Sequence, residues 1–268
     1  MIEARNISLT VDGRSLLKAV DLNVYPGQFT AIAGPNGAGK TSLLKVLSGE
    51  QARHTGEVSI NGLSTSLYLP SELALLRAVL PQSTNVQFSF SVRQIVEMGR
   101  RPHRSSISKT REVVEEVMDL TGVTGWADRN FVKLSGGEQQ RVQLARVLAQ
   151  VWEMQDRPRY ILLDEPTSSL DLAQQQMIFA LVKHACARNI GVVAIVHDLN
   201  QVTQVADKLY FLKEGSIVAG GKAREVFTKS IIEETYCCRV NVYHDPCTNC
   251  PYIIPDKHSF EALNKIIA

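Results

Sequence analysis

A glycine-rich run is the first segment of this chain whose residue types and spacing could do chemistry. It reads Gly34-Pro35-Asn36-Gly37-Ala38-Gly39-Lys40-Thr41, and Ser42 follows it. Glycines let backbone N–H groups turn inward around an anion, and the helix expected at 40–48 adds its positive end. The pattern predicts a loop that binds the phosphates of a nucleotide. Lys40 would reach the β- and γ-phosphates, and the Thr41 hydroxyl would hold Mg²⁺.

Two adjacent acids, Asp164 and Glu165, end the apolar run that starts at Tyr160. Ligands bind at the carboxyl ends of parallel strands, so both acids are expected at a site. Asp164 would hold Mg²⁺, and Glu165 would be the general base that polarises the attacking water. A solvated strand end can carry the same residues, but the phosphate loop favours the catalytic interpretation. Together the two segments predict a P-loop nucleoside triphosphatase.

The elements that must position these residues alternate between short apolar runs and helical runs, which is typical of a mainly parallel sheet covered by helices. Strands are expected at 2–10, 20–25, 29–33, 58–60, 77–80, 160–164, 192–196, 208–212 and 216–219. Helical spacing occurs at 92–98, 111–120 and 139–150, which predicts a helical lobe inserted between core strands.

Bulk composition excludes several classes of protein. The chain has 268 residues, 44% of them hydrophobic, and a formal net charge of +2. This near-balanced charge argues against nucleic-acid binding, which needs a basic excess. No run approaches the roughly 18 apolar residues that span a bilayer, and the N-terminus lacks the apolar region of a signal peptide. We therefore expect a cytoplasmic protein whose role at a membrane depends on a partner.

A third motif, Leu134-Ser135-Gly136-Gly137-Glu138, opens a helix and resembles the LSGGQ signature of the ABC ATPase family, with Glu138 in place of the commoner glutamine. A serine and two glycines at a helix start form a second anion site. In the family that it resembles, two ATP molecules lie between head-to-tail subunits. The resemblance therefore implies a homodimer in which Ser135, Gly136, Gly137 and Glu138 contact the ATP of the other chain.

Further marks of the ABC family follow in order along the chain. Gln82 matches the Q-loop, which implies contacts with Mg²⁺ and the attacking water. Asp171, after Ser169-Leu170, matches the D-loop that crosses the dimer interface, and His197 matches the switch histidine that contacts the γ-phosphate. Val11 stands where many members have an adenine-stacking aromatic residue, so an apolar contact without ring stacking is expected.

The resemblance covers about residues 2–225 and implies the domain organisation. We expect an α/β P-loop core with a parallel sheet, an N-terminal antiparallel β subdomain and an inserted helical subdomain. The predicted boundaries are 1–82 and 155–225 for the core with its β subdomain, 83–154 for the helical subdomain, and 226–268 for a C-terminal extension.

The stretch from Phe90 to His103 resembles ATPases that serve iron-siderophore, haem and vitamin B12 permeases, and the insertion Val151 to Pro158 favours the haem importers. This implies an integral-membrane permease dimer as partner and, indirectly, a periplasmic binding protein. The subunit would lie on the cytoplasmic face of a bacterial inner membrane. Ferric siderophore and vitamin B12 are the alternative cargoes. A soluble ABC regulator without a permease is the alternative of another class.

Two clusters remain outside these motifs. Arg100, Arg101 and Arg104 would meet anionic lipid or an acidic patch of the permease, or would form a solvated loop, which we favour. Four C-terminal cysteines with a nearby histidine have the spacing of a zinc or cluster site, or of a redox sensor. Simple thiols of an auxiliary tail are the interpretation that we favour for Cys237, Cys238, Cys247, Cys250 and His244.

Overall fold

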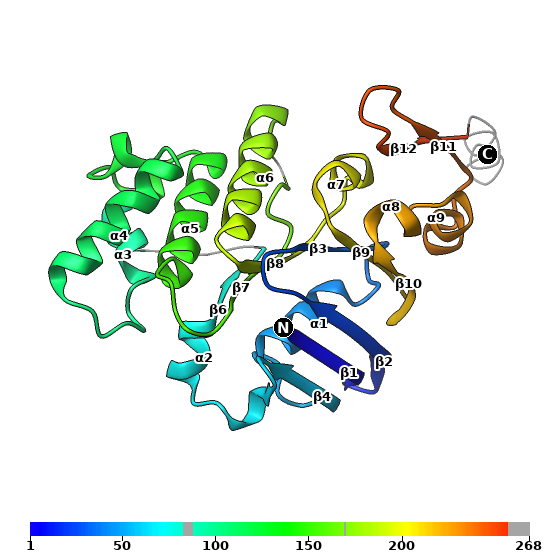
Figure 1. Cartoon of the computed structure of the whole chain (residues 1–268), viewed down its shortest axis with the longest axis horizontal. Coiled ribbons are helices and arrows are strands. Elements are labelled where there is room, and N and C mark those ends of the chain that lie inside the picture. Colours follow the sequence, from blue (N-terminus) through cyan, green and yellow to red (C-terminus); the bar gives the residue numbers. More distant parts are fainter. Residues whose placement is uncertain (83–87, 169, 257–268) are drawn as a thin grey trace. The chain divides into compact units, whose positions relative to one another are not determined.

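The computed structural model describes residues 1–82, 88–168 and 170–256 (Figure 1). The chain divides into two units. Unit 1 contains Met1–Ile2, Val24–Gln28 and Ser59–Ala194. Unit 2 contains Glu3–Asn23, Phe29–Val58 and the chain from Ile195 onward. Each unit is described by itself below.

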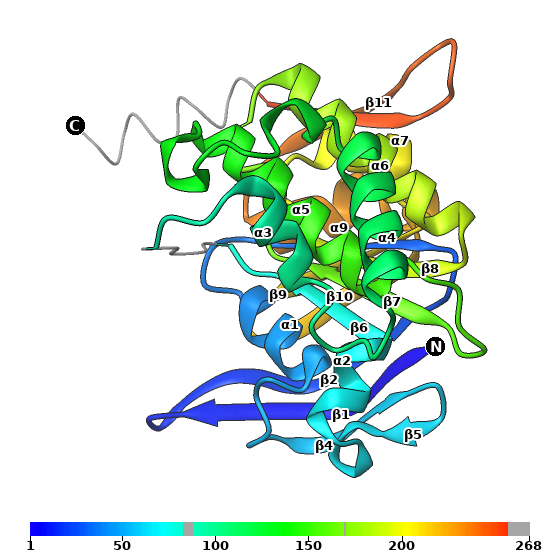
Figure 2. The ribbon, with the colours of Figure 1, turned by 90° about the vertical axis from the view of Figure 1, so that its left-hand side faces the viewer.

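Unit 2 begins with a hairpin of β1 (Ile2–Val11) and β2 (Arg14–Val24), and β4 (Thr55–Ile60) lies on the other side of β1 (Figure 2). The turn residues Asp12 and Gly13 have φ values of 48° and 76°. Positive φ at both positions matches the right-handed twist of the paired strands. Strand β2 begins six residues before the predicted start at 20, because its pairing with β1 extends through this mixed polar and apolar segment.

Unit 2 also contains the strand β3 (Phe29–Ala33), whose residues are all buried. This strand pairs in parallel with β9 (Lys208–Lys213), and β10 (Ser216–Lys222) pairs antiparallel with β9. Burial on both faces is typical of a parallel strand covered by helices. The remaining elements of the unit are α1 (Lys40–Ser48), α7 (Leu199–Val205), α8 (Ala223–Val226), α9 (Lys229–Tyr236), β11 (Val240–His244) and β12 (Pro251–Pro255).

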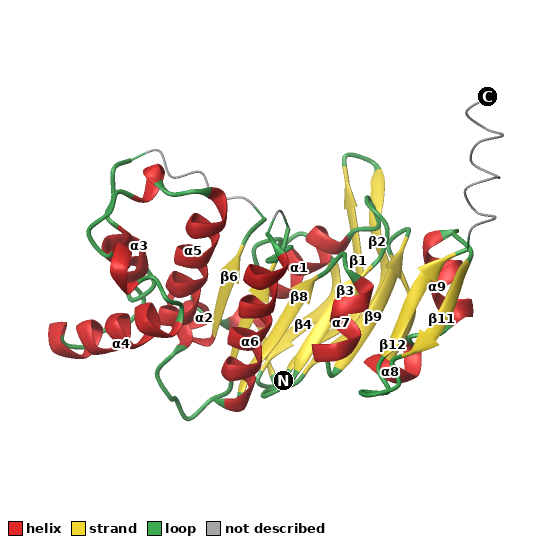
Figure 3. Ribbon diagram, turned by 90° about the horizontal axis from the view of Figure 1, so that it is seen from above, coloured by secondary structure: helices red, strands yellow, loops and turns green. Residues whose placement is uncertain are grey.

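Unit 1 contains three parallel strands in the order β6 (Arg77–Leu80), β7 (Arg159–Leu163) and β8 (Ile190–Ile195). The described residues between β6 and β7 contain several helices (Figure 3). Buried valine, leucine and methionine side chains bring three of these helices together, α3 (Val92–Met98), α4 (Ile107–Leu120) and α5 (Gly136–Val151). The other elements are β5 (Leu63–Ser64), α2 (Pro70–Leu76), α6 (Leu172–Ala187) and the 3-10 turns Thr65–Leu67, Thr124–Trp126 and Phe131–Lys133.

The predicted α/β class is confirmed, including the parallel strands, the N-terminal β subdomain and the inserted helices. Helices α2, α6 and α7 were not predicted from the sequence. The apolar residues of α6 are concentrated in its second half, from Ile178 to Cys186, so its first two turns carry no apolar stripe. Within the described residues, no helix combines the length and the apolar character needed to cross a bilayer.

Candidate active site

The phosphate loop of unit 2 follows β3 and leads directly into α1. Gly37 and Gly39 have φ values of 78° and 102°, in the region that favours glycine. A Cβ on Gly39 would lie 2.5 Å from the Leu16 carbonyl oxygen, and one on Gly34 would lie 2.0 Å from that of Leu212. Gly34 and Gly39 are therefore required by close backbone contacts, whereas Gly37 is required by its conformation alone.

The side chain of Lys40 folds back against the backbone at the start of this loop. It is 6% exposed, and its Nζ donates hydrogen bonds to the carbonyl oxygens of Gly34, at 2.8 Å, and Pro35, at 2.9 Å. The first turn of α1 contains no acidic residue. The helix N-terminus and one ammonium group thus point positive charge at the same place, which is the arrangement that binds phosphate.

In unit 1, the ends of β6 and β7 bring two predicted residues together. The Asp164 N–H donates to the Leu80 carbonyl oxygen at 2.8 Å, which holds the two strand ends side by side. Beyond them, Gln82 Nε2 donates to Glu165 Oε2 at 2.8 Å. Asp164 is only 5% exposed, whereas Gln82 is exposed. The structure therefore places a buried carboxylate next to an amide–carboxylate pair that water can reach.

Glu165 stands in a strained backbone conformation, with a φ of 51°. Its carbonyl oxygen accepts hydrogen bonds from the Ser168 N–H at 3.2 Å and the Ser168 hydroxyl at 3.0 Å. From α5, Gln140 Nε2 donates to the carbonyl oxygen of Pro166. Gln140 was not among the predicted site residues, although the run of glutamines after Glu138 was a visible signal.

The signature segment forms a capping box at the start of α5. Ser135 Oγ accepts from the Glu138 N–H at 3.4 Å, and Glu138 Oε2 accepts from the Ser135 N–H at 2.8 Å and from its hydroxyl at 2.7 Å. These bonds from Ser135 lower the pKa of the Glu138 carboxyl. The glutamate at this position thus fixes the serine that is expected to contact phosphate.

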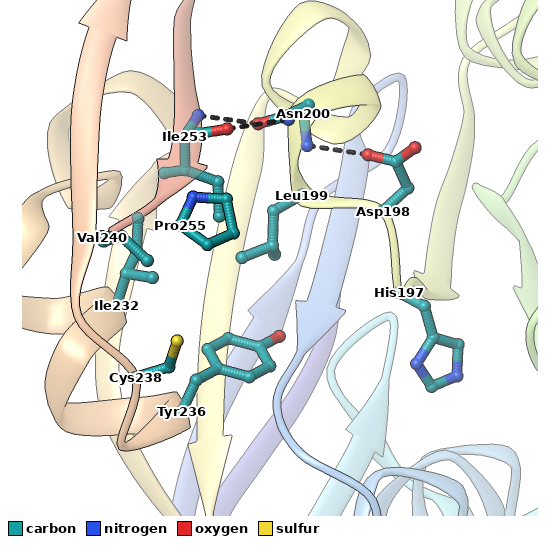
Figure 4. Close-up of a pocket in the computed structure, with 10 residues that line it drawn as sticks. All are labelled: His197, Asp198, Leu199, Asn200, Ile232, Tyr236, Cys238, Val240, Ile253 and Pro255. Carbon is teal, nitrogen blue, oxygen red and sulfur yellow. Dashed lines mark hydrogen bonds between the residues drawn. The ribbon is translucent and has the colours of Figure 1, made fainter. Parts of the chain in front are cut away.

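The other predicted residues occupy element ends. Asp171 caps α6 by accepting from the Gln174 N–H at 2.8 Å, and Ser169 lies outside the described residues. In unit 2, His197 follows β8 and is exposed, and the next residue, Asp198, caps α7 (Figure 4). Val11 ends β1 and is 39% exposed.

A sequence model described as "ABC transporter" matches residues 17–168, which is more than half of the chain. This chain belongs to the ABC transporter family. Proteins named hemin import ATP-binding protein HmuV from Mesorhizobium japonicum and Rhizobium meliloti are 42% and 43% identical to it, and each match covers 95% of this chain and 98% of the relative.

Solved structures of the ABC transporter family have the same fold. A chain of an inward-facing transporter described as metal-chelate type has a TM-score of 0.79 and 26% identity, with coverage of 97% of this chain and 98% of that one. A dimeric bacterial ABC transporter cassette has a TM-score of 0.73 and 28% identity, with coverage of 84% and 99%.

The prediction that Arg100 belongs to an exposed basic cluster is wrong. Its side chain is 2% exposed, pairs with the Glu153 carboxylate, and donates to the Ala149 carbonyl oxygen at 2.9 Å. His103 Nδ1 lies 3.3 Å from Glu153 Oε2, but burial lowers the pKa of His103, so Arg100 is the cation that needs the carboxylate. Arg101 and Arg104 are exposed, as a solvated loop requires.

Replacing Glu153 with alanine is expected to lower the free energy of unfolding by about 3 kcal/mol, because Arg100 then stays buried without its carboxylate partner. Urea denaturation followed by circular dichroism measures this change. The matched control is Glu112→Ala, which breaks an exposed pair with Lys109 and is expected to change stability far less, because water screens the pair. Equal effects of the two substitutions would contradict a structural role for the Arg100 pair.

A groove of about 410 Å³ lies beside this pair in unit 1 and is lined by residues of α2, of the loop after α3, and by Gln155. The lining residues are Ser71, Glu72, Leu75, Pro102, His103, Arg104 and Gln155. Three large apolar side chains next to them in sequence are strongly exposed: Leu69 at 63%, Ile107 at 91% and Met154 at 84%. Exposed apolar side chains on a protein surface are typical of a protein interaction site.

The C-terminal cysteines are all free thiols. Cys237 Sγ lies 3.2 Å from Lys213 Nζ, and Cys250 Sγ lies 3.3 Å from Arg224 Nη2. In the part of the chain that the structure describes, no three side chains of histidine, cysteine, aspartate or glutamate gather as a metal site would require.

Proposed function

We propose that this chain is the ATP-hydrolysing subunit of an ABC importer for haem, bound to a permease at the cytoplasmic face of the membrane. The hydrogen bond between Gln82 and Glu165, next to the buried Asp164, is the observation that carries the ATPase part. The cargo rests on the relatives named hemin import ATP-binding proteins, which are 38% to 43% identical to this chain.

Separate residues of the chain bind the phosphates, the base and Mg²⁺. Lys40 and the N–H groups at the start of α1 bind the β- and γ-phosphates, and Val11 contacts the base. Thr41, Gln82 and Asp164 offer the oxygen ligands that Mg²⁺ prefers, and the ion would neutralise charge on the phosphates.

Glu165 accepts a proton from water as the water oxygen attacks the γ-phosphorus atom. The bond from that phosphorus to the β-phosphate oxygen breaks, and ADP and phosphate are the products. His197 stabilises the γ-phosphate during this step. Gln82 keeps the Glu165 carboxylate oriented, and the hydrogen bonds of Ser168 and Gln140 hold the turn that presents it.

Two copies of the chain would enclose two ATP molecules, with the signature turn and Asp171 of one copy facing the nucleotide of the other. Gly136 supports this arrangement, because among the described residues a Cβ there would meet no atom from outside its own helix backbone within 4 Å. The space next to Gly136 is thus available to something outside the protomer.

Gly136→Asp is therefore expected to leave folding and ATP binding by the single chain within about two-fold, since an acid in the first turn suits a helix. The new carboxylate would repel the γ-phosphate of the partner's ATP and abolish ATP-dependent dimerisation. Size-exclusion chromatography of an Mg²⁺-free ATP complex measures this.

The matched control is Gly125→Asp, which places the same charge at another glycine with open space around it and should leave dimerisation intact. A dimer that forms normally with Gly136→Asp would contradict the shared ATP site.

We also propose that the permease contacts the groove around Arg104, because the exposed apolar side chains of Leu69, Ile107 and Met154, close in sequence to residues that line it, suit a helix of a membrane protein. Arg104→Glu should lower transporter-coupled ATP hydrolysis without changing hydrolysis by the isolated subunit.

Reconstitution with the permease tests cargo and partner together. Haem-loaded periplasmic binding protein should stimulate ATP hydrolysis, whereas stimulation by ferric siderophore or vitamin B12 would reassign the cargo. Failure to co-purify with any membrane protein would favour a soluble ABC regulator.

A further inference from the structure

The segment that carries Glu165 connects β7, which ends at Leu163, to α6, which begins at Leu172. Its described residues form turns and bends and belong to no helix or strand. Glu165 has a φ of 51°, a conformation that persists only where the surrounding contacts determine it. Because no strand or helix pairs the backbone here, side chains from other elements have to hold the segment in place.

Two glutamine side chains from two helices of unit 1 donate to this backbone. Gln140 of α5 donates to the Pro166 carbonyl oxygen. Gln175, near the start of α6, donates from Nε2 to the carbonyl oxygens of Leu170, at 3.1 Å, and Thr167, at 3.3 Å. The Thr167 carbonyl oxygen also accepts from the Leu170 N–H at 3.4 Å. The single amide of Gln175 therefore joins two points of a segment that no strand or helix holds.

The position of Gln175 suits a neutral donor. Its side chain is half-buried, so water competes less for the two carbonyl oxygens than it would at the surface. If the donor is removed, these oxygens lose a partner that water replaces incompletely. An amide also adds no charge to the segment that carries the catalytic carboxylate, whereas a lysine or arginine donor would.

The helix start that carries Gln175 is itself fixed. The Gln175 N–H donates to the Asp171 carbonyl oxygen at 2.9 Å, and the Asp171 carboxylate caps α6 through the Gln174 N–H at 2.8 Å. The amide therefore projects from a rigid element, which is the arrangement that positions a functional group most precisely.

We propose that Gln175 is a positioning residue for ATP hydrolysis, whose amide holds the segment between β7 and α6 so that Glu165 is presented to the attacking water. Gln175 acts through the backbone of Thr167 and Leu170 and is not itself a catalytic residue. The proposal rests on the proposed function, because Glu165 is taken to be the general base.

Gln175→Leu removes the donor and keeps a side chain of similar size. The kcat for ATP hydrolysis is expected to fall about ten-fold, because a base that is slightly misplaced loses much of its effect. The KM for ATP should stay within about two-fold, since the residues that bind the phosphates are unchanged. Phosphate release over a range of ATP concentrations measures both constants.

The matched control is Gln176→Leu, which makes the same change at the exposed neighbouring position and should leave kcat and KM unchanged. Gln175→Glu is a second variant, which keeps the shape of the side chain but offers no N–H donor when ionised. Its kcat should fall at least as far as that of Gln175→Leu, because a carboxylate repels the two carbonyl oxygens. Circular dichroism shows whether each variant is folded, and either Gln175 variant alone is sufficient for the test.

Three results would overturn the proposal: a native kcat in a folded Gln175 variant, an equal loss with Gln176→Leu, or a loss of kcat with a matching rise in KM. The last result would indicate a general structural role. If Glu165→Gln hydrolyses ATP at the native rate, the proposed role of the base fails instead. Loss of hydrolysis with Glu165→Gln and native hydrolysis with Gln175→Leu contradict only the positioning role.

Discussion

Glu165→Gln is expected to slow ATP hydrolysis by about 10²- to 10⁴-fold, the contribution of a positioned general base. An amide has nearly the same shape as the carboxylate but cannot take a proton from water. Its oxygen can still accept the hydrogen bond from Gln82 Nε2, which is 2.8 Å long with the native carboxylate. The substitution therefore removes the base and leaves the local geometry in place.

The same variant is expected to bind ATP normally and to accumulate as an ATP-bound dimer, because the step that opens the dimer no longer occurs. Phosphate release measures hydrolysis, and size-exclusion chromatography with ATP measures the dimer. Glu57→Gln, which removes an exposed carboxylate of β4, is the matched control and should hydrolyse ATP at the native rate. A native rate with Glu165→Gln would mean that another group is the base.

Lys40→Met should weaken ATP binding by about 10²-fold or more. Each hydrogen bond to a charged group contributes about 1.5–3 kcal/mol, and 1.4 kcal/mol corresponds to a factor of ten in affinity. Methionine fills a similar volume in this buried position but offers no donor to phosphate. Hydrolysis should fall with binding, since the same ammonium stabilises the γ-phosphate as it is transferred.

Lys45→Met is the control for Lys40→Met, because Lys45 is exposed on the same helix. Its substitution removes the same charge away from the phosphate loop. Fluorescence titration with a nucleotide analogue compares the two affinities. Thermal unfolding without nucleotide shows whether loss of the bonds to Gly34 and Pro35 has disturbed the loop. A native affinity with Lys40→Met would remove this residue from the phosphate site.

Features that depend on neighbouring residues could be predicted from the sequence. The helix expected at 40–48 is α1 with the same bounds, and the strands expected at 29–33 and 77–80 are β3 and β6. Glycines at fixed offsets, a serine at a helix start and an apolar run before two acids are all local signals. They determined where the phosphate loop, the signature turn and the acids stand in the chain.

Tertiary packing decided the contacts between distant segments. Gln82 and Glu165 are 83 residues apart, and they meet because β6 and β7 pair in parallel and end together. Gln140 reaches Pro166 for a related reason, since α5 packs against β7. No local pattern marks such pairs, because pairing depends on which strands and helices become neighbours.

The burial of charge could not be predicted from the sequence either. Arg100 lies next to other arginines in the sequence, which predicts an exposed side chain. In the structure, the helices of unit 1 bury it together with Glu153. The sequence by itself determined the chemistry of the nucleotide site from local spacing. Only the tertiary structure decided which groups orient that chemistry, because burial and long-range hydrogen bonds exist only in the packed chain.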